Sequence, residues 1–274
     1  MDNKVRLQVL GSSSRGNATA LWGNKKALLV DCGLGKKYIQ NRLKKLNINY
    51  TDIQGVLITH GHSDHVRRAA FKLMLDNEIK IYCHETVAEI LKLKFKIAVS
   101  AEKNGFLKTF KTGEFMEFEH FRVRGFEVVH DTHCFGFNIV TGTGEDTRKV
   151  TVATDLGNTK NGITDNFINS DIIIIESNYD KNMLLNSSRP GWLKSRISDR
   201  SHLSNRECAK FIQKVIKKSM IWPRAIILAH ISQECNTGLL AQNTVKEVLS
   251  FEMENPPKVF LTYDREVSKI ISLF

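Results

Sequence analysis

The segment Thr59-His60-Gly61-His62-Ser63-Asp64-His65 decides how this 274-residue sequence is interpreted. It follows the apolar run Gly55–Ile58, a predicted strand, and precedes a predicted helix over Asp64–Leu75 for which Ser63 is the expected cap. Three histidines and one aspartate lie within residues 60–65, on a turn where rigid flanking elements can aim side chains at metal ions. Imidazole and carboxylate ligands suit zinc, manganese or iron. The segment therefore predicts a metal site in preference to a polar surface loop.

Four further segments place an aspartate or a histidine at the end of a predicted apolar strand. In chain order they are 28–33 with Asp31, 128–131 with His130, 152–157 with Asp155 and 226–230 with His230. Together with HGHSDH, these elements resemble, in kind and order, the HxHxDH pattern and strand-end residues of the metallo-β-lactamase superfamily. The resemblance implies an α/β protein with that superfamily's αββα four-layer sandwich.

The same resemblance implies a cofactor of two divalent metal ions, zinc or manganese, and a ligand for each position. The implied ligands are His60, His62 and His130 for one ion, Asp64, His65 and His230 for the other, and Asp155 bridging both. A hydroxide between the ions would be the nucleophile, so Asp64 and Asp155 would also be catalytic. Asp31 would orient the metal-binding turn by hydrogen bonding, or would only cap a loop.

Several segments resemble one branch of the superfamily, the YycJ/WalJ-like exonucleases. They are Leu10–Asn17, Arg189–Ile197, Ser201–Asn205 and Ala229–Thr237. This resemblance implies a metal-dependent phosphodiesterase acting on nucleic acid, specifically a 5′ to 3′ DNA exonuclease of bacterial or phage type. The alternatives are a small-molecule hydrolase of the same fold, cutting a thioester, lactone or cyclic nucleotide, and a non-catalytic binding protein. The complete ligand set argues against the last.

Two regions are candidates for contact with the substrate phosphate. The loop after the first strand offers Ser12, Ser13, Ser14 and Asn17. Its hydroxyls and backbone N–H groups could cradle a phosphate, although its glycines could equally serve a tight turn. Lys194 and Arg196 precede His202, which could contact the scissile phosphate or protonate the leaving oxygen. The alternative for His202 is a cap of the helix that begins at Asn205.

The remaining candidate residues receive ordinary structural interpretations. Arg67 and Arg68 could hold a DNA backbone or form a solvated helix face. His133 is interpreted as loop structure, and His84 and His120 as surface or satisfied core residues. The five cysteines include no CxxC pair, which predicts reduced, mostly buried thiols.

Composition indicates the partner and the setting. The 40 Lys and Arg against 29 Asp and Glu give a formal charge of +11, which favours a nucleic-acid partner or only serves solubility. The resemblance to the exonuclease branch implies DNA in preference to RNA. No apolar run has the length of a membrane span or a signal peptide, so we expect no membrane association and a cytoplasmic setting, in a bacterial cell or a phage-infected host.

Periodicity predicts one domain over residues 1–274. Apolar positions at helical spacing favour helices over Gly35–Leu46 and Asn205–Lys217, and a long antiparallel strand is expected over Phe115–Val129. The run Asp171–Glu176 contains four consecutive isoleucines and is expected to be a strand buried on both faces. No proline-rich linker or low-complexity run divides the chain.

Overall fold

Two mixed β-sheets form the centre of the molecule. The computed structural model describes residues 5–159, 162–250, 253–264 and 266–274, and each sheet has seven strands within these ranges. The first sheet has the order β14 (Ile271–Ser272), β1 (Arg6–Gly11), β2 (Ala18–Gly23), β3 (Lys26–Val30), β4 (Ile53–Ile58), β5 (Ile81–His84), β6 (Leu107–Phe110). The second has the order β13 (Lys258–Leu261), β12 (Ala225–Ala229), β11 (Ile172–Glu176), β10 (Arg148–Ala153), β9 (Cys134–Thr141), β8 (Arg122–Val128), β7 (Phe115–Glu117).

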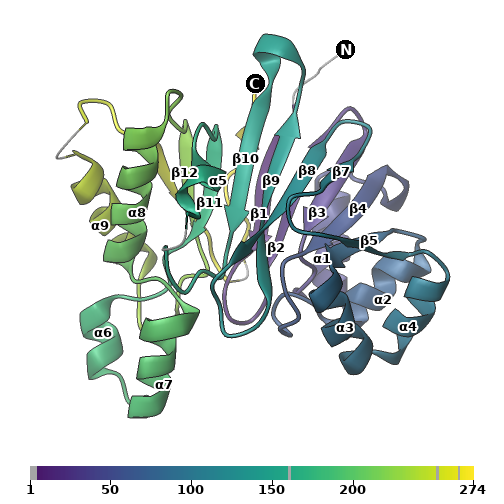
Figure 1. Ribbon diagram of the computed structural model, residues 1–274, viewed down its shortest axis with the longest axis horizontal. Coiled ribbons are helices and arrows are strands. Elements are labelled where there is room, and N and C mark those ends of the chain that lie inside the picture. The colour runs from purple at the N-terminus through teal and green to yellow at the C-terminus, as the bar shows by residue number, and fades with distance from the viewer. Residues whose placement is uncertain (1–4, 160–161, 251–252, 265) are drawn as a thin grey trace.

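Helices cover the outer faces of both sheets, so the α/β sandwich that the sequence predicts is confirmed (Figure 1). On one side lie α1 (Lys36–Lys45), α2 (Arg68–Asp76), α3 (Glu85–Lys94) and α4 (Lys96–Lys103). On the other lie α5 (Thr164–Phe167), α6 (Lys181–Asn186), α7 (Gly191–Arg196), α8 (Asn205–Lys218) and α9 (Gly238–Ser250). The sheets face each other, and the largest apolar core cluster contains residues from both of them.

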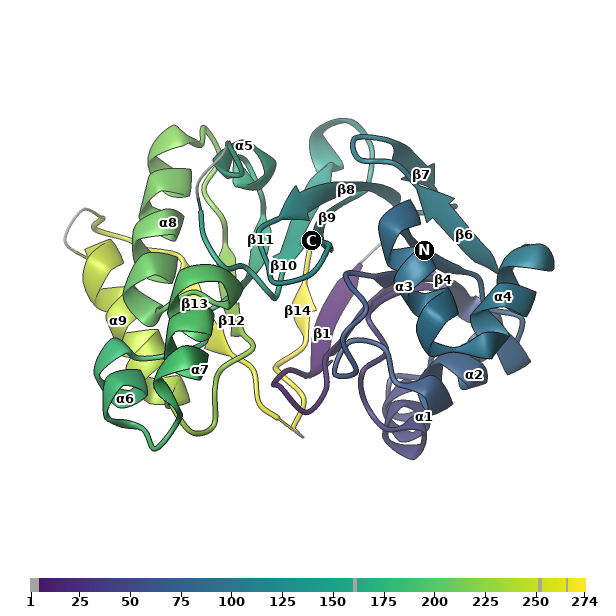
Figure 2. The ribbon, with the colours of Figure 1, turned by 60° about the horizontal axis from the view of Figure 1, so that its bottom comes forward.

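Each sheet contains a parallel half, and this determines where a site can form. Strands β3 to β6 run parallel in one sheet, and β10 to β13 run parallel in the other. All five residues of β11 are buried, as expected for a parallel strand covered on both faces. Parallel strands end at a common edge, where ligand sites of open α/β sheets occur. This edge comes forward in Figure 2.

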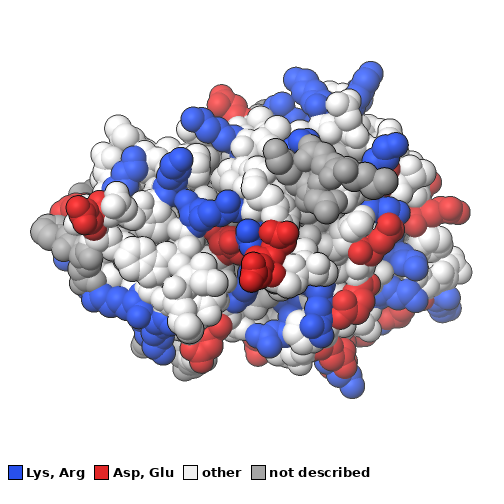
Figure 3. Space-filling view, turned by 90° about the horizontal axis from the view of Figure 1, so that it is seen from above, with Lys and Arg blue, Asp and Glu red and all other residues white. Residues whose placement is uncertain are grey.

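Opposite that edge, charges of both signs are mixed. Figure 3 shows this face from above, with lysine and arginine side chains interspersed among aspartate and glutamate. The positive excess of the sequence therefore forms no single-sign patch on this face.

Three details of secondary structure differ from expectation. The helix expected from Asp64 begins only at Arg68, because Val66 pairs with Cys32 in a parallel bridge and the N–H of Arg67 donates to the Cys32 carbonyl. The strand expected over residues 115–129 is two strands, since residues 118–121 form a turn closed by the Phe118 N–H and the Phe121 carbonyl. Helix α4 and strand β6 were not expected.

Two compositional expectations can be compared with the structure. All five cysteines are free and buried, as predicted. Among the described residues, no helix is both long and apolar enough to cross a bilayer.

Candidate metal centre

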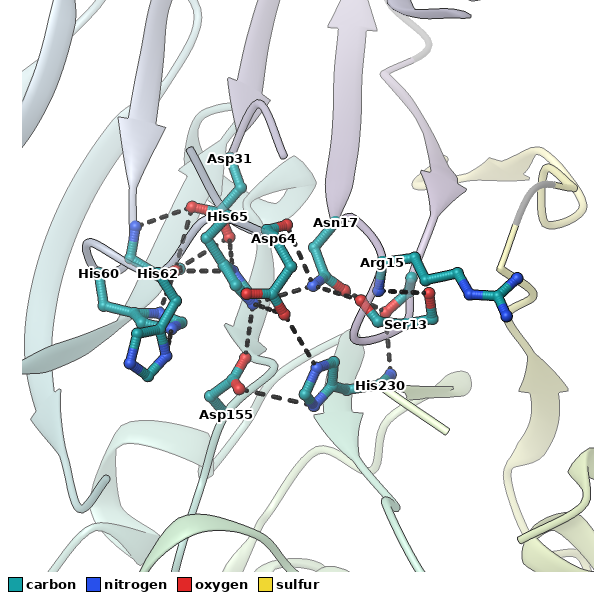
Figure 4. Close-up of polar contacts among 12 residues, drawn as sticks. Ser13, Arg15, Asn17, Asp31, His60, His62, Asp64, His65, Asp155 and His230 are labelled. Atoms are coloured by element: carbon teal, nitrogen blue, oxygen red, sulfur yellow. Dashed lines mark hydrogen bonds and ion pairs between the residues drawn. The ribbon is translucent and has the colours of Figure 1, made fainter. Parts of the chain in front are cut away.

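The expected ligands gather at the edge where the two sheets meet (Figure 4). Strand β4 leads to residues 60–65, β8 to His130, β10 to Asp155 and β12 to His230. Their potential ligand atoms form groups within which all atoms lie no more than 4.8 Å apart. Three of these groups are His60, His62 and His130; His60, His65 and Asp155; and Asp64, His65 and His230. The first and third coincide with the two ligand sets that the sequence resemblance implies.

Hydrogen bonds fix how the histidine rings are presented. Nδ1 of His65 lies 2.7 Å from Asp31 Oδ2, Nδ1 of His130 lies 2.8 Å from the Ser201 carbonyl oxygen, and Nδ1 of His230 lies 2.8 Å from Glu176 Oε1. An imidazole that donates from Nδ1 presents the lone pair of Nε2 as a metal ligand. Each of these rings therefore turns its Nε2 toward the centre, where Nε2 of His65 lies 2.9 Å from Asn17 Nδ2 and 2.9 Å from Asp155 Oδ2.

Asp31 supports the metal-binding turn by hydrogen bonding. It ends β3 with a left-handed backbone (φ 63°), and its side chain is buried. Its Oδ1 accepts the backbone N–H of Thr59 at 2.9 Å, while its Oδ2 accepts from His65. Asp31 therefore fixes both the start of the turn and one of its rings.

The donor set fits divalent cations. Nε2 of His130, Nε2 of His230 and Oδ2 of Asp155 are buried and make no well-aligned hydrogen bond in the described part of the chain, although Asp131, Asp64 and His65 lie 3.1, 3.5 and 2.9 Å from them, respectively. Buried polar atoms are ordinarily satisfied, and an ion is one of the explanations when they are not. Nitrogen and carboxylate oxygen are the ligand types of zinc and related metals. These residues can therefore hold metal ions.

The two halves of the cluster differ in electrostatic character. Burial lowers the pKa of His60 well below its ordinary value, and the neighbouring His65 imidazole adds to this. Burial also opposes charge on His230, but Asp155, Asp64 and Glu176 outweigh it and raise the pKa of His230 to about 10. His60 thus favours its neutral form, whereas His230 lies in a half rich in carboxylates. Cations in the second half would neutralise that negative charge.

Glu176 is a functional residue that the sequence interpretation missed. It ends β11, is completely buried, and its Oε1 lies 2.8 Å from His230 Nδ1 and 2.7 Å from His202 Nδ1. Its Oε2 accepts the N–H of Leu156 at 2.9 Å. Burial raises its pKa, but His202 and His230 outweigh this, so the pKa lies below the ordinary value. The available signal was a carboxylate ending an otherwise apolar strand.

His202 lies beside the cluster and does not cap a helix. Its ring centroid is 5.4 Å from that of His130 and 5.1 Å from that of His230, and its side chain is 19% exposed. Ser204 is the cap of α8, in a capping box with Glu207. The capping alternative for His202 is therefore wrong, and the ring is partly open to solvent at the centre.

Two distant segments hold the backbone of His230. This residue has a left-handed backbone (φ 53°), which is unfavourable for a side chain of this size. Its N–H donates to Ser12 Oγ at 2.9 Å, and its carbonyl oxygen accepts from Asn178 Nδ2 at 2.7 Å. The loop after β1 therefore helps to position a residue more than 200 positions later in the chain.

The loop over residues 12–17, here called the serine loop, lies at the metal centre. Most of its side chains that were expected to contact the phosphate are buried. Ser12 donates to Asn17 Oδ1, Ser13 donates to Asp264, and Asn17 Nδ2 lies 2.9 Å from His65 Nε2. Only Ser14 of the expected four is exposed. A phosphate role for these residues stays a prediction, and three of them also have bonds that hold the site together.

The basic candidates are tethered near the centre. Arg196 donates from Nε to Asp131 Oδ2 at 2.9 Å, and the other oxygen of Asp131 lies 3.1 Å from His130 Nε2. Lys194 donates to the Leu185 carbonyl oxygen. Arg67 donates to the Arg15 carbonyl oxygen. Of these basic side chains, Arg196 is the one that bonds Asp131, the residue next to the proposed ligand His130.

The other histidines have the ordinary settings that were expected, and for Arg68 both alternatives, a DNA contact and a solvated helix face, stay predictions. His84 accepts a bond from the Thr86 N–H and stacks on Phe135, and His120 lies beside Glu119. His133 is exposed and belongs to no group of potential ligands in the described residues. Arg68 is exposed on the first turn of α2.

An αββα sandwich with a histidine and aspartate cluster at the shared edge of its sheets defines the class of metal-dependent hydrolases with the metallo-β-lactamase fold. Comparisons with known proteins agree. The model of the β-lactamase superfamily domain matches residues 26–231. Exodeoxyribonuclease YycJ of Bacillus anthracis is 29% identical over 89% of each chain, and exodeoxyribonuclease WalJ of Streptococcus pneumoniae is 30% identical over 89% of this chain and 88% of its own.

Solved structures support the fold. The metallo-β-lactamase fold protein YhfI of Bacillus subtilis superimposes with a TM-score of 0.68 at 15% identity, covering 98% of this chain and 99% of its own. The short form of human tRNase Z gives 0.65 at 18% identity, with coverage of 98% and 99%. The chain belongs to the β-lactamase superfamily domain family, and within it to the YycJ/WalJ-like proteins.

Proposed function

We propose that this protein is a metal-dependent DNA exonuclease that degrades from a 5′ end and uses two divalent ions, zinc or manganese. The observation that carries the proposal is the gathering of the residues His60, His62, His130, Asp64, His65, Asp155 and His230 beside the Glu176–His202 pair. Relatives of equal extent are named exodeoxyribonucleases, which supports DNA as the substrate. A charge of +11 supports attraction to a polyanion.

The proposed ligands are those of the two sets, with Asp155 bridging. When bound, such ions would lower the pKa of water and neutralise charge on a phosphate, so that no side-chain nucleophile is needed. Asp155 is suited to bridging because its Oδ2 lies 2.9 Å from Nε2 of His65, in one ligand set, and its Oδ1 lies 3.8 Å from Nε2 of His130, in the other. It therefore faces ligands on both sides of the cluster.

His202 would supply the proton for the leaving oxygen. Glu176 holds its Nδ1, so Nε2 is the nitrogen left for the substrate, and the ring is next to both ligand sets. Arg196, Lys194 and the exposed part of the serine loop would hold the phosphate. In this arrangement the buried carboxylate only positions the ring, and the ring performs the proton transfer.

We expect His202→Ala to lower kcat about 10²- to 10⁴-fold, the usual contribution of a general acid. Metal content should be unchanged, because the ring belongs to neither proposed ligand set. Single-turnover cleavage and metal per chain would be measured together, with His120→Ala as a control histidine outside the centre. Wild-type kcat in His202→Ala would exclude the proton-transfer role.

The substrate and polarity are tested with end-labelled DNA. Protein loaded with manganese or zinc should release a 5′ label at once as mononucleotides or short oligomers, while a 3′ label stays on a strand that shortens progressively. Activity should fall steeply with salt, because backbone contacts release counterions. Asp64→Ala is the inactive control.

The opposite outcome identifies the alternative. Absence of metal-dependent cleavage of single-stranded and duplex DNA, together with rapid turnover of a thioester or lactone, would assign the protein to the small-molecule hydrolases of this fold. Immediate release of the 3′ label would keep the nuclease and reverse the polarity.

A further inference from the structure

Helices α6 and α7 form a small hairpin with its own apolar cluster. The hairpin lies below α8 in Figure 1, at the end of the molecule that carries the metal centre, and is seen from that side in Figure 2. Its cluster consists of Tyr179, Leu184, Ile197 and Cys235, with Leu193 packed against it. Lys194 ties α7 to α6 through the Leu185 carbonyl, and Arg189 pairs with Glu234 at 2.9 Å. The hairpin therefore has a defined structure.

The largest apolar side chain of the hairpin is excluded from that cluster. Trp192 is 69% exposed, although its neighbour Leu193 packs inward. Burying an indole contributes more to folding than burying any side chain in the cluster. The stability of the hairpin therefore does not explain the position of Trp192.

Trp192 is aligned with the metal centre. It precedes Arg196 by four residues, so the two side chains lie on the same face of α7, with Cβ atoms about 5–6 Å apart. Arg196 binds Asp131, and Asp131 lies 3.1 Å from His130 Nε2. The exposed indole of Trp192 thus lies one helical turn farther from the metal centre than Arg196, which lies at the edge of the centre.

The charge around the indole suits a polyanion. Residues 181–200 contain the basic residues Lys181, Arg189, Lys194, Arg196 and Arg200, and a single acidic one, Asp199. Proteins that bind single-stranded nucleic acid combine such basic surfaces with exposed aromatic rings on which bases stack. A protein or lipid partner would more often require several contiguous apolar side chains, whereas Leu185 is the one other large apolar side chain exposed on the described hairpin.

We propose that Trp192 is a stacking platform for an unpaired nucleobase, close to the scissile phosphate that Arg196 helps to hold. The inference rests on the proposed function and makes single-stranded DNA, or the unpaired end of a duplex, the substrate. Bases inside a duplex are already stacked on their neighbours, so only an unpaired base can use the indole.

The test measures binding separately from cleavage. Metal-loaded protein is titrated with a fluorescent single-stranded oligonucleotide whose phosphorothioate linkages slow hydrolysis, and KM and kcat are measured on ordinary single-stranded DNA. We expect Trp192→Ala to weaken binding and raise KM about 5- to 150-fold, the range for loss of one stacked base, with kcat nearly unchanged. Trp192→Phe should retain part of the affinity.

The matched control is Trp222→Ala. This indole is 48% exposed but follows the far end of α8, a 14-residue helix that spans about 21 Å. It should leave affinity and KM at wild-type values. A second control uses oligonucleotides with an abasic site at each of the first three positions. One of these abasic oligonucleotides should bind wild type more weakly than the intact oligonucleotide does. The same oligonucleotide should bind Trp192→Ala as tightly as the intact one does.

The outcomes distinguish this inference from the proposed function. If wild type cleaves DNA and Trp192→Ala has wild-type KM and affinity, the stacking platform alone is overturned. The same follows if the loss of affinity caused by the abasic site and the loss caused by the substitution are additive. Trp192-dependent binding without cleavage would support the platform and reject the nuclease. Absence of both binding and cleavage in the wild type would overturn both.

Discussion

Replacing Asp155 with alanine should remove metal from the centre and lower activity more than about a thousandfold. The carboxylate is 2% exposed and lies between His65 of one ligand set and His130 of the other. Burial opposes its charge, but His230 and His65 hold its pKa well below the ordinary value, so it remains an anion suited to bridging two cations. The fold should persist, because apolar strands on both sides build the core independently.

Metal per chain, turnover and circular dichroism would be measured on the same preparation. Asp165→Ala is the control carboxylate, since its side chain is 74% exposed on α5 and contacts only Lys218 among ion-pair partners in the described residues. Full metal content and full turnover in Asp155→Ala would show that this residue does not bridge. Loss of the native circular dichroism spectrum would instead give Asp155 a role in folding.

Adding a single methyl group at Gly33 should disrupt the centre without touching any proposed ligand side chain. A Cβ at this position would lie 1.6 Å from the carbonyl oxygen of Asp64 and 2.8 Å from the backbone nitrogen of His65. Both are backbone atoms of the metal-binding turn, so the turn itself must move. We expect Gly33→Ala to lose at least one metal and to be less stable by about 1–3 kcal/mol or more.

Gly35→Ala is a closely matched control, because the nearby glycine has open space around its Cβ position and a backbone φ of −61° that any residue adopts. Its melting temperature and metal content should equal those of the wild type. For a chain of this size, the loss in Gly33→Ala corresponds to about 2–4 °C per kcal/mol. An equal melting temperature and equal metal content in both variants would contradict the steric argument.

Much of the fold could be predicted because its strands are short and apolar and are separated by recognisable turns. The four isoleucines of β11 and the run of β12 indicate buried parallel strands without any tertiary information. The start of α2 could not be predicted this way. Ser63 has the composition of a helix cap, but the backbone after it is held by bonds to Cys32, which is distant in sequence. The turn at residues 118–121 contains no glycine, proline or asparagine to mark it.

The centre shows the same division between local and distant information. HGHSDH is a local pattern, so its ligand types are visible in the sequence. The role of Glu176 depends on two histidines that lie 26 and 54 positions later and meet it only in the folded chain. In the sequence, Ser12 is one residue of a polar loop, and only the folded structure gives its bond to the His230 backbone. Supporting residues of this kind have no periodicity that a sequence could reveal.

The bond between Ser12 and His230 has a consequence for biosynthesis. Ser12 is synthesised 218 residues before His230, and β1 is synthesised before β14, the strand with which it pairs. A growing chain that has reached only β11 contains Glu176 but lacks the ring at residue 230 that this carboxylate orients. The proposed metal centre can therefore be completed only after residue 230 has been synthesised. A chain that terminates upstream of residue 230 would lack one of the proposed metal ligands.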